Sequence, residues 1–305
     1  MAIAQMKKIM IASHRSEASE LLEALQRAGR VQILDAERAM VSKEWPELET
    51  KGMRRKDLEH LVARLEKSIE FLDEYATEKS PKSLLNPLIP VDAESYEQAV
   101  KSGETLSLLE SVEETSGKIE RLLNDKENAA GQIKMMLPWK DLSTPVEELK
   151  KLETVVCITG LLPSQNFDDI AESLEEYNVI LESAGRYEQF DACLVVCRKD
   201  VVSQVQKTLR SGDFEYVSFE GFEGTASEII SETQTRLKEI DEKLKKTREK
   251  AASLASNILL LQMLYDYNSN LLGREKTGAN CPSTENITFF EGWVTKEDFK
   301  TIENI

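Results

Sequence analysis

The sequence predicts an α+β fold in which two ferredoxin-like α/β lobes are joined by a long antiparallel coiled-coil helical hairpin, giving an elongated dumbbell. Heptad-spaced apolar residues fill two stretches, and short strand and helix signals alternate in the segment between them. Charged residues make up 31% of the 305 residues and aromatic residues only 6%, a balance that favours long solvated helices over one large globule. A chain of this length can still bury one or two small cores.

The amino-terminal segment, residues 1–50, predicts the first part of a proximal lobe. The apolar run from Met6 to Ala12 is typical of a strand, and a helix over residues 17–28 follows, with Ser16 as its expected cap. Gly29 ends this helix before a strand over residues 31–34. The turn after the first strand contains no glycine, so it is a poor phosphate cradle.

Residues 51–137 predict an outgoing helical arm. Its first helix spans about 53–77, and the proline-rich segment 80–91 breaks the helix because proline lacks the amide donor. A second helix is expected over 92–137, ended by Pro138. The apolar seam of the first helix is Leu58, Val62, Leu65, Ile69, Leu72 and Ala76, and that of the second is Ala99, Gly103, Leu106, Val112, Ile119, Leu123, Ala130, Ile133 and Leu137.

Residues 225–273 predict the returning arm and carry the clearest periodicity in the chain. Steps of three and four follow one another without a slip through Ile230, Thr233, Leu237, Ile240, Leu244, Thr247, Ala251, Leu254, Ile258, Leu261, Tyr265, Asn268 and Leu272. One continuous helix of this length would measure roughly 65–70 Å. We expect it to pair antiparallel with the second outgoing helix.

Residues 138–224 predict a distal ferredoxin-like lobe. The elements expected are strand 154–159, helix 165–177, strand 179–182, strand 192–197, helix 201–209 and strand 214–219, in the order βαββαβ. Trp139 lies where the second helix enters this lobe, and we expect it to pack against the sheet. A binding anchor is the alternative role for this side chain.

Residues 274–305 predict the second part of the proximal lobe, with a strand over 284–290, then Gly292-Trp293-Val294, then a helix beginning near Lys296. The pattern of strand, glycine turn and amphipathic helix repeats that of Gly160-Leu161-Leu162, which is also followed by apolar residues at the same offsets. If the two copies are equivalent, a strand should follow the last helix, and we therefore expect the chain to be a truncated piece of a longer protein. Trp293 is expected to pack as Trp139 does.

The charge and apolar patterning exclude several functional classes. The net charge of −16 speaks against nucleic acid and anionic lipid as partners. No stretch approaches 18 uninterrupted apolar residues, so direct membrane insertion by this chain is not expected. The apolar setting of the cysteines and the lack of a secretory signal indicate a reducing cytosolic compartment.

The sequence predicts no catalytic, cofactor-binding or metal-binding residues, and hence a non-enzymatic protein. His14 and His60 have no partner at metal-ligand spacing. Cys193 and Cys197 lie on one face of a predicted strand, where a buried thiol cluster, with Cys157 in the same sheet, is favoured over a zinc site. The fourth cysteine is Cys281, and the motifs of nucleotide hydrolases, serine hydrolases and zinc proteases are absent from the sequence.

Several short motifs, in this order and with heptad helices between them, resemble the cytoplasmic amino-terminal domain of subunit I, called subunit a in eukaryotes, of the rotary V/A-type ATPases and ATP synthases. Together they span nearly the whole chain. The motifs are Met6-Lys7-Lys8-Ile9, Leu25-Gln26-Arg27-Ala28-Gly29 before Val31-Gln32-Ile33, Leu137-Pro138-Trp139, and Phe290-Glu291-Gly292-Trp293-Val294.

This resemblance implies a stator subunit at the cytoplasmic face of the membrane. It implies docking of peripheral-stalk subunits, the E and G type heterodimers, on both lobes, and contact with the membrane rotor ring through a carboxy-terminal membrane domain that this chain lacks. Rotation would then be coupled to ion translocation without a catalytic site here. Thr295 stands where the family often has proline.

Two other interpretations of the same pattern stay open. One is a coiled-coil scaffold of another kind, for which the acidic charge and the lack of a P-loop are unfavourable. The other is a ligand-sensing regulatory protein, because ferredoxin-like lobes can bind small molecules, although fold alone does not establish function.

Overall fold

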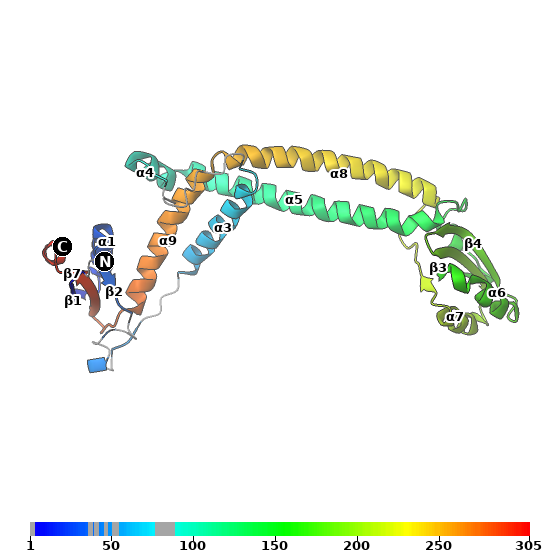
Figure 1. Cartoon of the computed structure of the whole chain (residues 1–305), viewed down its shortest axis with the longest axis horizontal. Helices are drawn as coiled ribbons and strands as arrows, with labels where there is room; N and C mark the ends of the chain where they lie inside the picture. The colour runs from blue at the N-terminus through cyan, green and yellow to red at the C-terminus, as the bar shows by residue number, and fades with distance from the viewer. Residues whose placement is uncertain (1–3, 36–38, 40–42, 46–47, 51–54, 77–88) are drawn as a thin grey trace. The chain divides into compact units, whose positions relative to one another are not determined.

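The computed structural model describes residues 4–35, 39, 43–45, 48–50, 55–76 and 89–305. It combines helices with two antiparallel sheets (Figure 1). The chain divides into two compact units, one formed by Met1–Thr115 with Lys250–Ile305 and the other by Ser116–Glu249. Two long helices, α5 and α8, pass from one unit into the other.

The first unit contains a three-stranded sheet in the order β1-β7-β2. Strand β7 (Ile287–Thr295) lies in the centre and pairs antiparallel with β1 (Met6–His14) and β2 (Val31–Ile33). Helices α1 (Ala18–Ala28) and α10 (Phe299–Glu303) cover one face of this sheet. The buried side chains between these helices and the sheet are Leu22, Leu25, Phe290, Val294 and Ile302.

The glycines of the repeated motif lie inside strands, so the expected glycine turns are wrong. Strand β3 (Val155–Pro163) runs through Gly160, and β7 runs through Gly292. A Cβ atom at Gly160 would lie 2.3 Å from the Glu215 carbonyl oxygen, and one at Gly292 would lie 2.6 Å from the Gln32 carbonyl oxygen. Each glycine therefore allows the backbone beside its strand to approach closely.

Helix α1 begins differently from the prediction and ends as predicted. Its N-cap is Glu17, without a side-chain cap, and the Ser16 hydroxyl lies 2.7 Å from Nδ1 of His14 instead. At the other end Gly29 has φ 64°, and its N–H bonds to the carbonyl oxygens of Leu25 and Gln26. A left-handed residue at this place favours glycine.

Four helical segments of the first unit meet in one apolar cluster. They are α3 (Lys56–Asp73), α9 (Ile258–Asn280), the start of α5 (Gly103–Met136) and the end of α8 (Ala226–Ala255), while α4 (Ala93–Lys101) packs against α9. Asp92 caps α4 by accepting a hydrogen bond from the Ser95 N–H at 2.8 Å. The buried members of the cluster are Leu65, Leu72, Leu109, Val112, Ala255, Leu261 and Leu264.

The expectation of one unbroken returning helix is wrong, because α8 ends at Ala255 and α9 begins at Ile258. At the break the Ser256 hydroxyl donates to the Ser253 carbonyl oxygen, and the Asn257 N–H donates to the Leu254 carbonyl oxygen. Beyond the break α9 packs against α3. The periodicity continues through the break because both helices bury an apolar stripe, each against a different neighbour.

The expected helix over 92–137 is likewise two helices, separated at Ser102. The Ser102 hydroxyl accepts a hydrogen bond from the Glu104 N–H at 3.0 Å, as a capping residue does. Most of the predicted proline break, residues 80–88, lies outside the described residues. Pro90 is described and precedes α4.

The second unit contains a four-stranded sheet in the order β4-β5-β3-β6. The strands are β3, β4 (Ile180–Tyr187), β5 (Phe190–Arg198) and β6 (Glu215–Tyr216), and every pairing is antiparallel. Helices α6 (Phe167–Glu175) and α7 (Val202–Ser211) pack on one face, so the chain order is β3-α6-β4-β5-α7-β6. Three single-turn 3-10 helices accompany them, η1 (Leu137–Trp139), η2 (Glu148–Lys150) and η3 (Ser164–Asn166).

The other face of this sheet is covered by a second apolar cluster. Trp139 is fully buried in it, and its ring meets that of Phe219 edge-on at 5.1 Å between centroids. Packing of Trp139 at the entrance to the sheet is therefore confirmed. The buried members of the cluster are Met136, Trp139, Val146, Ala192, Phe219, Ala226, Ile229 and Ile230.

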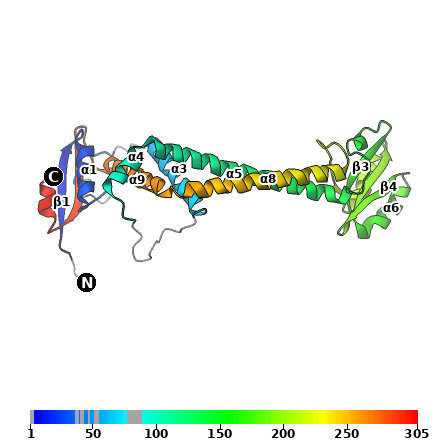
Figure 2. The ribbon, with the colours of Figure 1, turned by 90° about the horizontal axis from the view of Figure 1, so that it is seen from above.

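Within the second unit, α5 and α8 lie side by side (Figures 1 and 2). Lys126 Nζ of α5 lies 2.6 Å from Asp241 Oδ1 of α8. The predicted apolar seam of α5 is partly wrong, because it assigned Leu106 and Leu123 to the buried side of the helix. These two side chains are 46% and 43% exposed. The buried apolar side chains of α5 follow a stricter heptad, Leu109, Val112, Ile119, Leu122, Ala129 and Met136.

Leu109 and Leu106 of α5 form a matched pair for testing the first apolar cluster. Leu109→Ala should lower the free energy of unfolding by about 2–5 kcal/mol, because Leu109 is 1% exposed and its removal leaves a cavity. Leu106→Ala should change it by no more than about 0.5 kcal/mol. Urea denaturation followed by circular dichroism measures both, and equal effects of the two variants would contradict the cluster.

Candidate docking surfaces

The three-stranded sheet has a second face, away from α1, which we call the outer face. Side chains alternate between the two faces along each strand, and the pairing of β1 with β7 places Lys8 opposite Trp293 and Met10 opposite Glu291. The outer face includes Met6, Lys8, Met10 and Ala12 of β1 with Ile287, Phe289, Glu291 and Trp293 of β7.

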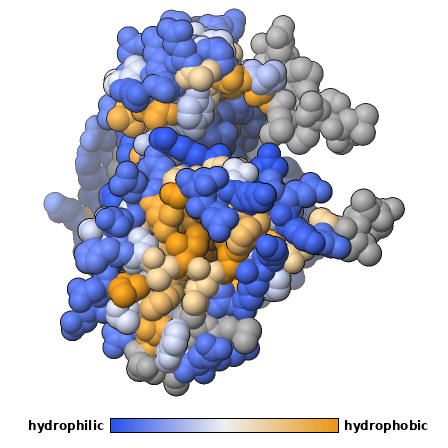
Figure 3. All heavy atoms as spheres, turned by 90° about the vertical axis from the view of Figure 1, so that its left-hand side faces the viewer, coloured by the Kyte–Doolittle hydropathy of each residue, from blue (hydrophilic) through white to orange (hydrophobic). Residues whose placement is uncertain are grey.

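Four large apolar side chains of the outer face remain open to solvent. The exposed fractions are 48% for Met6, 56% for Met10, 40% for Ile287 and 37% for Trp293. Figure 3, which views this end of the chain, shows apolar side chains gathered in a band bordered by hydrophilic surface. A contiguous apolar patch of this kind is typical of an interaction site, whereas single exposed apolar residues are ordinary.

One ion pair lies within this apolar surface. Lys8 forms a salt bridge with Glu291, whose side chain is only 4% exposed. The pair neutralises the carboxylate on the apolar surface, where an isolated charge would be costly. Phe289, beside it on β7, has its ring 6.1 Å from that of Trp45.

The amino-terminal end of β1 carries basic side chains. Lys7, on the helix-covered face, places its Nζ 3.9 Å from the centre of the Phe299 ring. Lys296 donates from its N–H to the Gln5 carbonyl oxygen at 2.8 Å and from Nζ to the Gln5 amide oxygen at 3.3 Å. Lys8, paired with Glu291, and the acidic Glu297 and Asp298 lie near these lysines, so charges of both signs meet at this end of the sheet.

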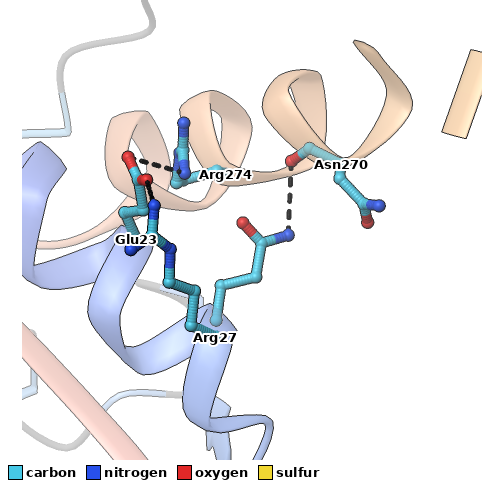
Figure 4. Close-up of polar contacts among 5 residues, drawn as sticks. Glu23, Arg27, Asn270 and Arg274 are labelled. Carbon is cyan, nitrogen blue, oxygen red and sulfur yellow. Dashed lines mark hydrogen bonds and ion pairs between the residues drawn. The ribbon is translucent and has the colours of Figure 1, made fainter. Parts of the chain in front are cut away.

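Polar contacts between α1 and α9 hold the sheet's covering helix to the arm (Figure 4). Glu23 accepts from Arg27 Nη2 at 2.7 Å and lies 3.2 Å from Arg274 Nη1. Gln26 donates from Nε2 to the Asn270 carbonyl oxygen at 3.5 Å. The helices approach closely at Gly278, where a Cβ would lie 3.0 Å from the Leu22 side chain.

The two arginines that share Glu23 differ in burial, and this difference allows a direct test. Arg274 is 17% exposed and Arg27 is 80% exposed. Arg274→Gln should lower the free energy of unfolding by about 1 kcal/mol, because the partly buried Arg274 loses both its packed side chain and its contact with Glu23. Arg27→Gln should cost less than about 0.5 kcal/mol. Thermal and urea denaturation check both, and a larger loss from Arg27→Gln would contradict the contact.

The two histidines lie in different elements, His14 on β1 and His60 on α3. His14 contacts Ser16, and His60 is exposed on α3. Among the residues that the structure describes, no three His, Cys, Asp or Glu side chains are grouped so as to hold a metal ion. No helix in the described ranges is long and apolar enough to cross a membrane.

The cysteines are free thiols in apolar surroundings. Cys193 and Cys197 are buried between β5 and the helices α6 and α7. Cys157 lies in the same sheet, on β3, and is half-buried. Burial raises the pKa of Cys193 to about 12 and the pKa of Cys281 to about 11, so both are protonated and unreactive at neutral pH.

The raised pKa of Cys193 makes stability depend on pH in the alkaline range. The unfolded thiol ionises near its ordinary value of 9.0, whereas the folded thiol stays neutral up to about pH 12. The free energy of unfolding should therefore fall between these values, by about 1.4 kcal/mol for each pH unit from this thiol. Urea denaturation from pH 8 to 10.5 should show a shallower fall for Cys193→Ala, and parallel curves would contradict this account.

No known family model matches the chain. The A-type ATP synthase subunit I of Methanocaldococcus jannaschii is 23% identical over 321 residues, which cover 99% of this chain and 46% of the relative. The same subunit of Methanothermobacter thermautotrophicus is 24% identical over 320 residues, covering 95% of this chain and 47% of the relative. The chain thus spans about half the length of these relatives.

The crystal structure of the cytoplasmic N-terminal domain of subunit I, the homologue of subunit a, of V-ATPase has the same mixed helical and sheet fold. Its TM-score with this chain is 0.50 at 18% sequence identity, over 97% of this chain and 96% of that one. The resemblance to subunit I is confirmed. It extends along nearly the entire chain, in sequence to the two archaeal subunits and in fold to the cytoplasmic domain of subunit I.

Proposed function

We propose that this chain is the non-catalytic stator part of a V/A-type rotary ATPase or ATP synthase. In this role it links peripheral stalks to the membrane sector, so that rotation is coupled to ion translocation. The observation that carries the proposal is the similarity to subunit I of two archaeal A-type ATP synthases along 95% or more of the chain.

We further propose that the β-rich parts are the two ferredoxin-like lobes of the predicted dumbbell. Read from its β6 edge, the four-stranded sheet has the order β6-β3-β5-β4, the fourth, first, third and second strands of a βαββαβ unit. In the three-stranded sheet, β1-β7-β2 matches the last three positions of that order. The domain division proposed is 1–50 with 274–305, 138–224, and the arms 51–137 and 225–273, with α5 and α8 as the antiparallel coiled coil.

The mechanical role follows from the helices between the lobes. A rotary motor transmits torque only if its stationary parts resist rotation relative to one another. A helix pair that buries a heptad seam is stiff along its length, and each lobe offers a surface for another protein. Helix α5 has 34 residues and α8 has 30, so the spacer would be long compared with either lobe.

We propose as partners the stalk subunits of the E and G type, at the cytoplasmic face of the membrane. The rotor ring would be reached through a membrane domain of the longer protein. A catalytic role is not proposed, since the pKa values of the buried Cys193 and Cys281 are raised to about 12 and about 11, the opposite of what a thiol nucleophile needs.

Capture of a stalk heterodimer by the immobilised chain tests this function. The probe is the purified E and G type heterodimer of the same assembly, passed over the chain at physiological salt. Saturable binding is expected, and bovine serum albumin on a matched surface serves as the control for non-specific retention. A complete lack of retention by the unmodified chain would contradict the stator function.

A further inference from the structure

A cavity of about 200 Å³ lies between the beginning of α1 and the end of α9, within the first unit. Arg15 and Ser19 line it from the α1 side, Arg274 and Glu275 from α9, and Thr288 from β7. Sites for drug-sized ligands usually measure about 300–1,000 Å³, so an occupant of this cavity must be small.

The first turn of α1 presents backbone N–H groups to this cavity. Its N-cap, Glu17, makes no side-chain hydrogen bond, and the neighbouring Ser16 hydroxyl contacts His14 instead. The first amides of an α-helix have no acceptor within the helix, and their dipoles favour an anion. Ala18 and Ser19, which carry two of these amides, line the cavity.

A buried hydroxyl lines the same cavity. Thr288 is 5% exposed and lies on the face of β7 that α1 covers, as Phe290 does. Its hydroxyl forms no hydrogen bond with any other group in the described part of the chain. Buried hydroxyl groups are normally hydrogen-bonded, and an anion in the cavity supplies the acceptor that this one lacks.

Two guanidinium groups give the cavity an excess of positive charge. Arg15 forms no ion pair with a described residue. Arg274 pairs with Glu23 through Nη1 (Figure 4), and its Nε is buried without an acceptor among the residues that the structure describes. One acidic side chain, Glu275, also lines the cavity, and it lies within electrostatic reach of Arg55.

We propose that this cavity binds a small anion that carries a phosphate group, either inorganic phosphate or a short phosphate monoester. The amides of Ala18 and Ser19 and the guanidinium of Arg15 hold the phosphate oxygens, and the Thr288 hydroxyl donates to one of them. The turn after β1 lacks the glycines of a backbone cradle, and side chains take their place here. This inference does not depend on the proposed function.

The bound anion connects the sheet to the arm. Arg15, Ser19 and Thr288 belong to the sheet and its covering helix, whereas Arg274 belongs to α9. An anion that contacts both walls stabilises their packing, to an extent that grows with its concentration. Phosphate should therefore raise the melting temperature of the full chain.

Isothermal titration calorimetry of the full chain with inorganic phosphate, at constant ionic strength, tests the site. Arg15→Gln should lower the affinity by about tenfold, as the loss of a charge-assisted hydrogen bond does. Thr288→Val keeps the branched shape of the side chain and should lower the affinity about fivefold. Arg121→Gln, the same change at an exposed arginine of α5 outside the cavity, is the control and should bind as the unmodified chain does.

Melting temperatures separate ligand binding from a purely structural role. Without phosphate, Thr288→Val should melt at or above the temperature of the unmodified chain, because a methyl group replaces a buried hydroxyl that has no partner. Phosphate should raise the melting temperature of Arg121→Gln as it raises that of the unmodified chain, and should raise that of Arg15→Gln less. A Thr288→Val variant that melts lower without phosphate and binds it with unchanged affinity would remove the hydroxyl from the site.

Three results would overturn the inference. The first is an unmodified chain that shows neither heat of binding nor thermal stabilisation with phosphate up to about 10 mM. The second is equal affinity of the unmodified chain, Arg15→Gln and Thr288→Val. The third is retention on vesicles containing phosphatidic acid that Arg15→Gln abolishes, which would assign the phosphate group to a lipid headgroup. Tighter binding of glycerol phosphate than of inorganic phosphate would support the site and identify a monoester as its ligand.

Discussion

The pairing of β1 with β7 is the constraint on which the rest of the structure depends. It joins nine residues near the start of the chain to nine residues near its end, in continuous antiparallel register from Met6 opposite Thr295 to His14 opposite Ile287. Such a pairing closes a loop of more than 250 residues, and loop closure lowers the conformational entropy of the chain. The apolar contacts that the pairing completes must offset this entropy loss. Phe290 and Val294 of β7, with Leu22 and Leu25 of α1, supply those contacts.

Because both ends of the loop are fixed in one sheet, every helix that leaves the sheet needs a helix that returns. The packing of α3 on α9 meets this requirement within the first unit. The heptad pattern predicted the long helices because a helix that packs against only one neighbour buries a narrow stripe of apolar side chains along one side. The same pattern hid the breaks at Ser102 and at Ser256–Asn257, since each new helix resumes a seam with a similar period.

The strands of both sheets were recognisable from the sequence, but their outer faces were not. In Met6-Lys7-Lys8-Ile9-Met10 the two adjacent lysines interrupt the alternation of apolar and polar residues that would identify the two faces of the strand. The pairing of β1 with β7 shows that Met6, Lys8 and Met10 share a face. Trp139 and Trp293 offered the same sequence signal of an aromatic beside a sheet. One is fully buried and the other is 37% exposed, because the neighbours that decide burial are distant in the sequence.

The contrast between the two tryptophans also bears on how a stator can be assembled. A face that is completed within the chain, as around Trp139, contributes to the stability of the fold before any partner arrives. A face left apolar and open, as around Trp293, gains its burial only on association, so the same hydrophobic free energy is available for binding. The Lys8–Glu291 ion pair keeps the open face free of an isolated charge, and docking there can remove water without leaving a carboxylate unpaired. Burial is thus complete around Trp139 on one sheet and incomplete around Trp293 on the other.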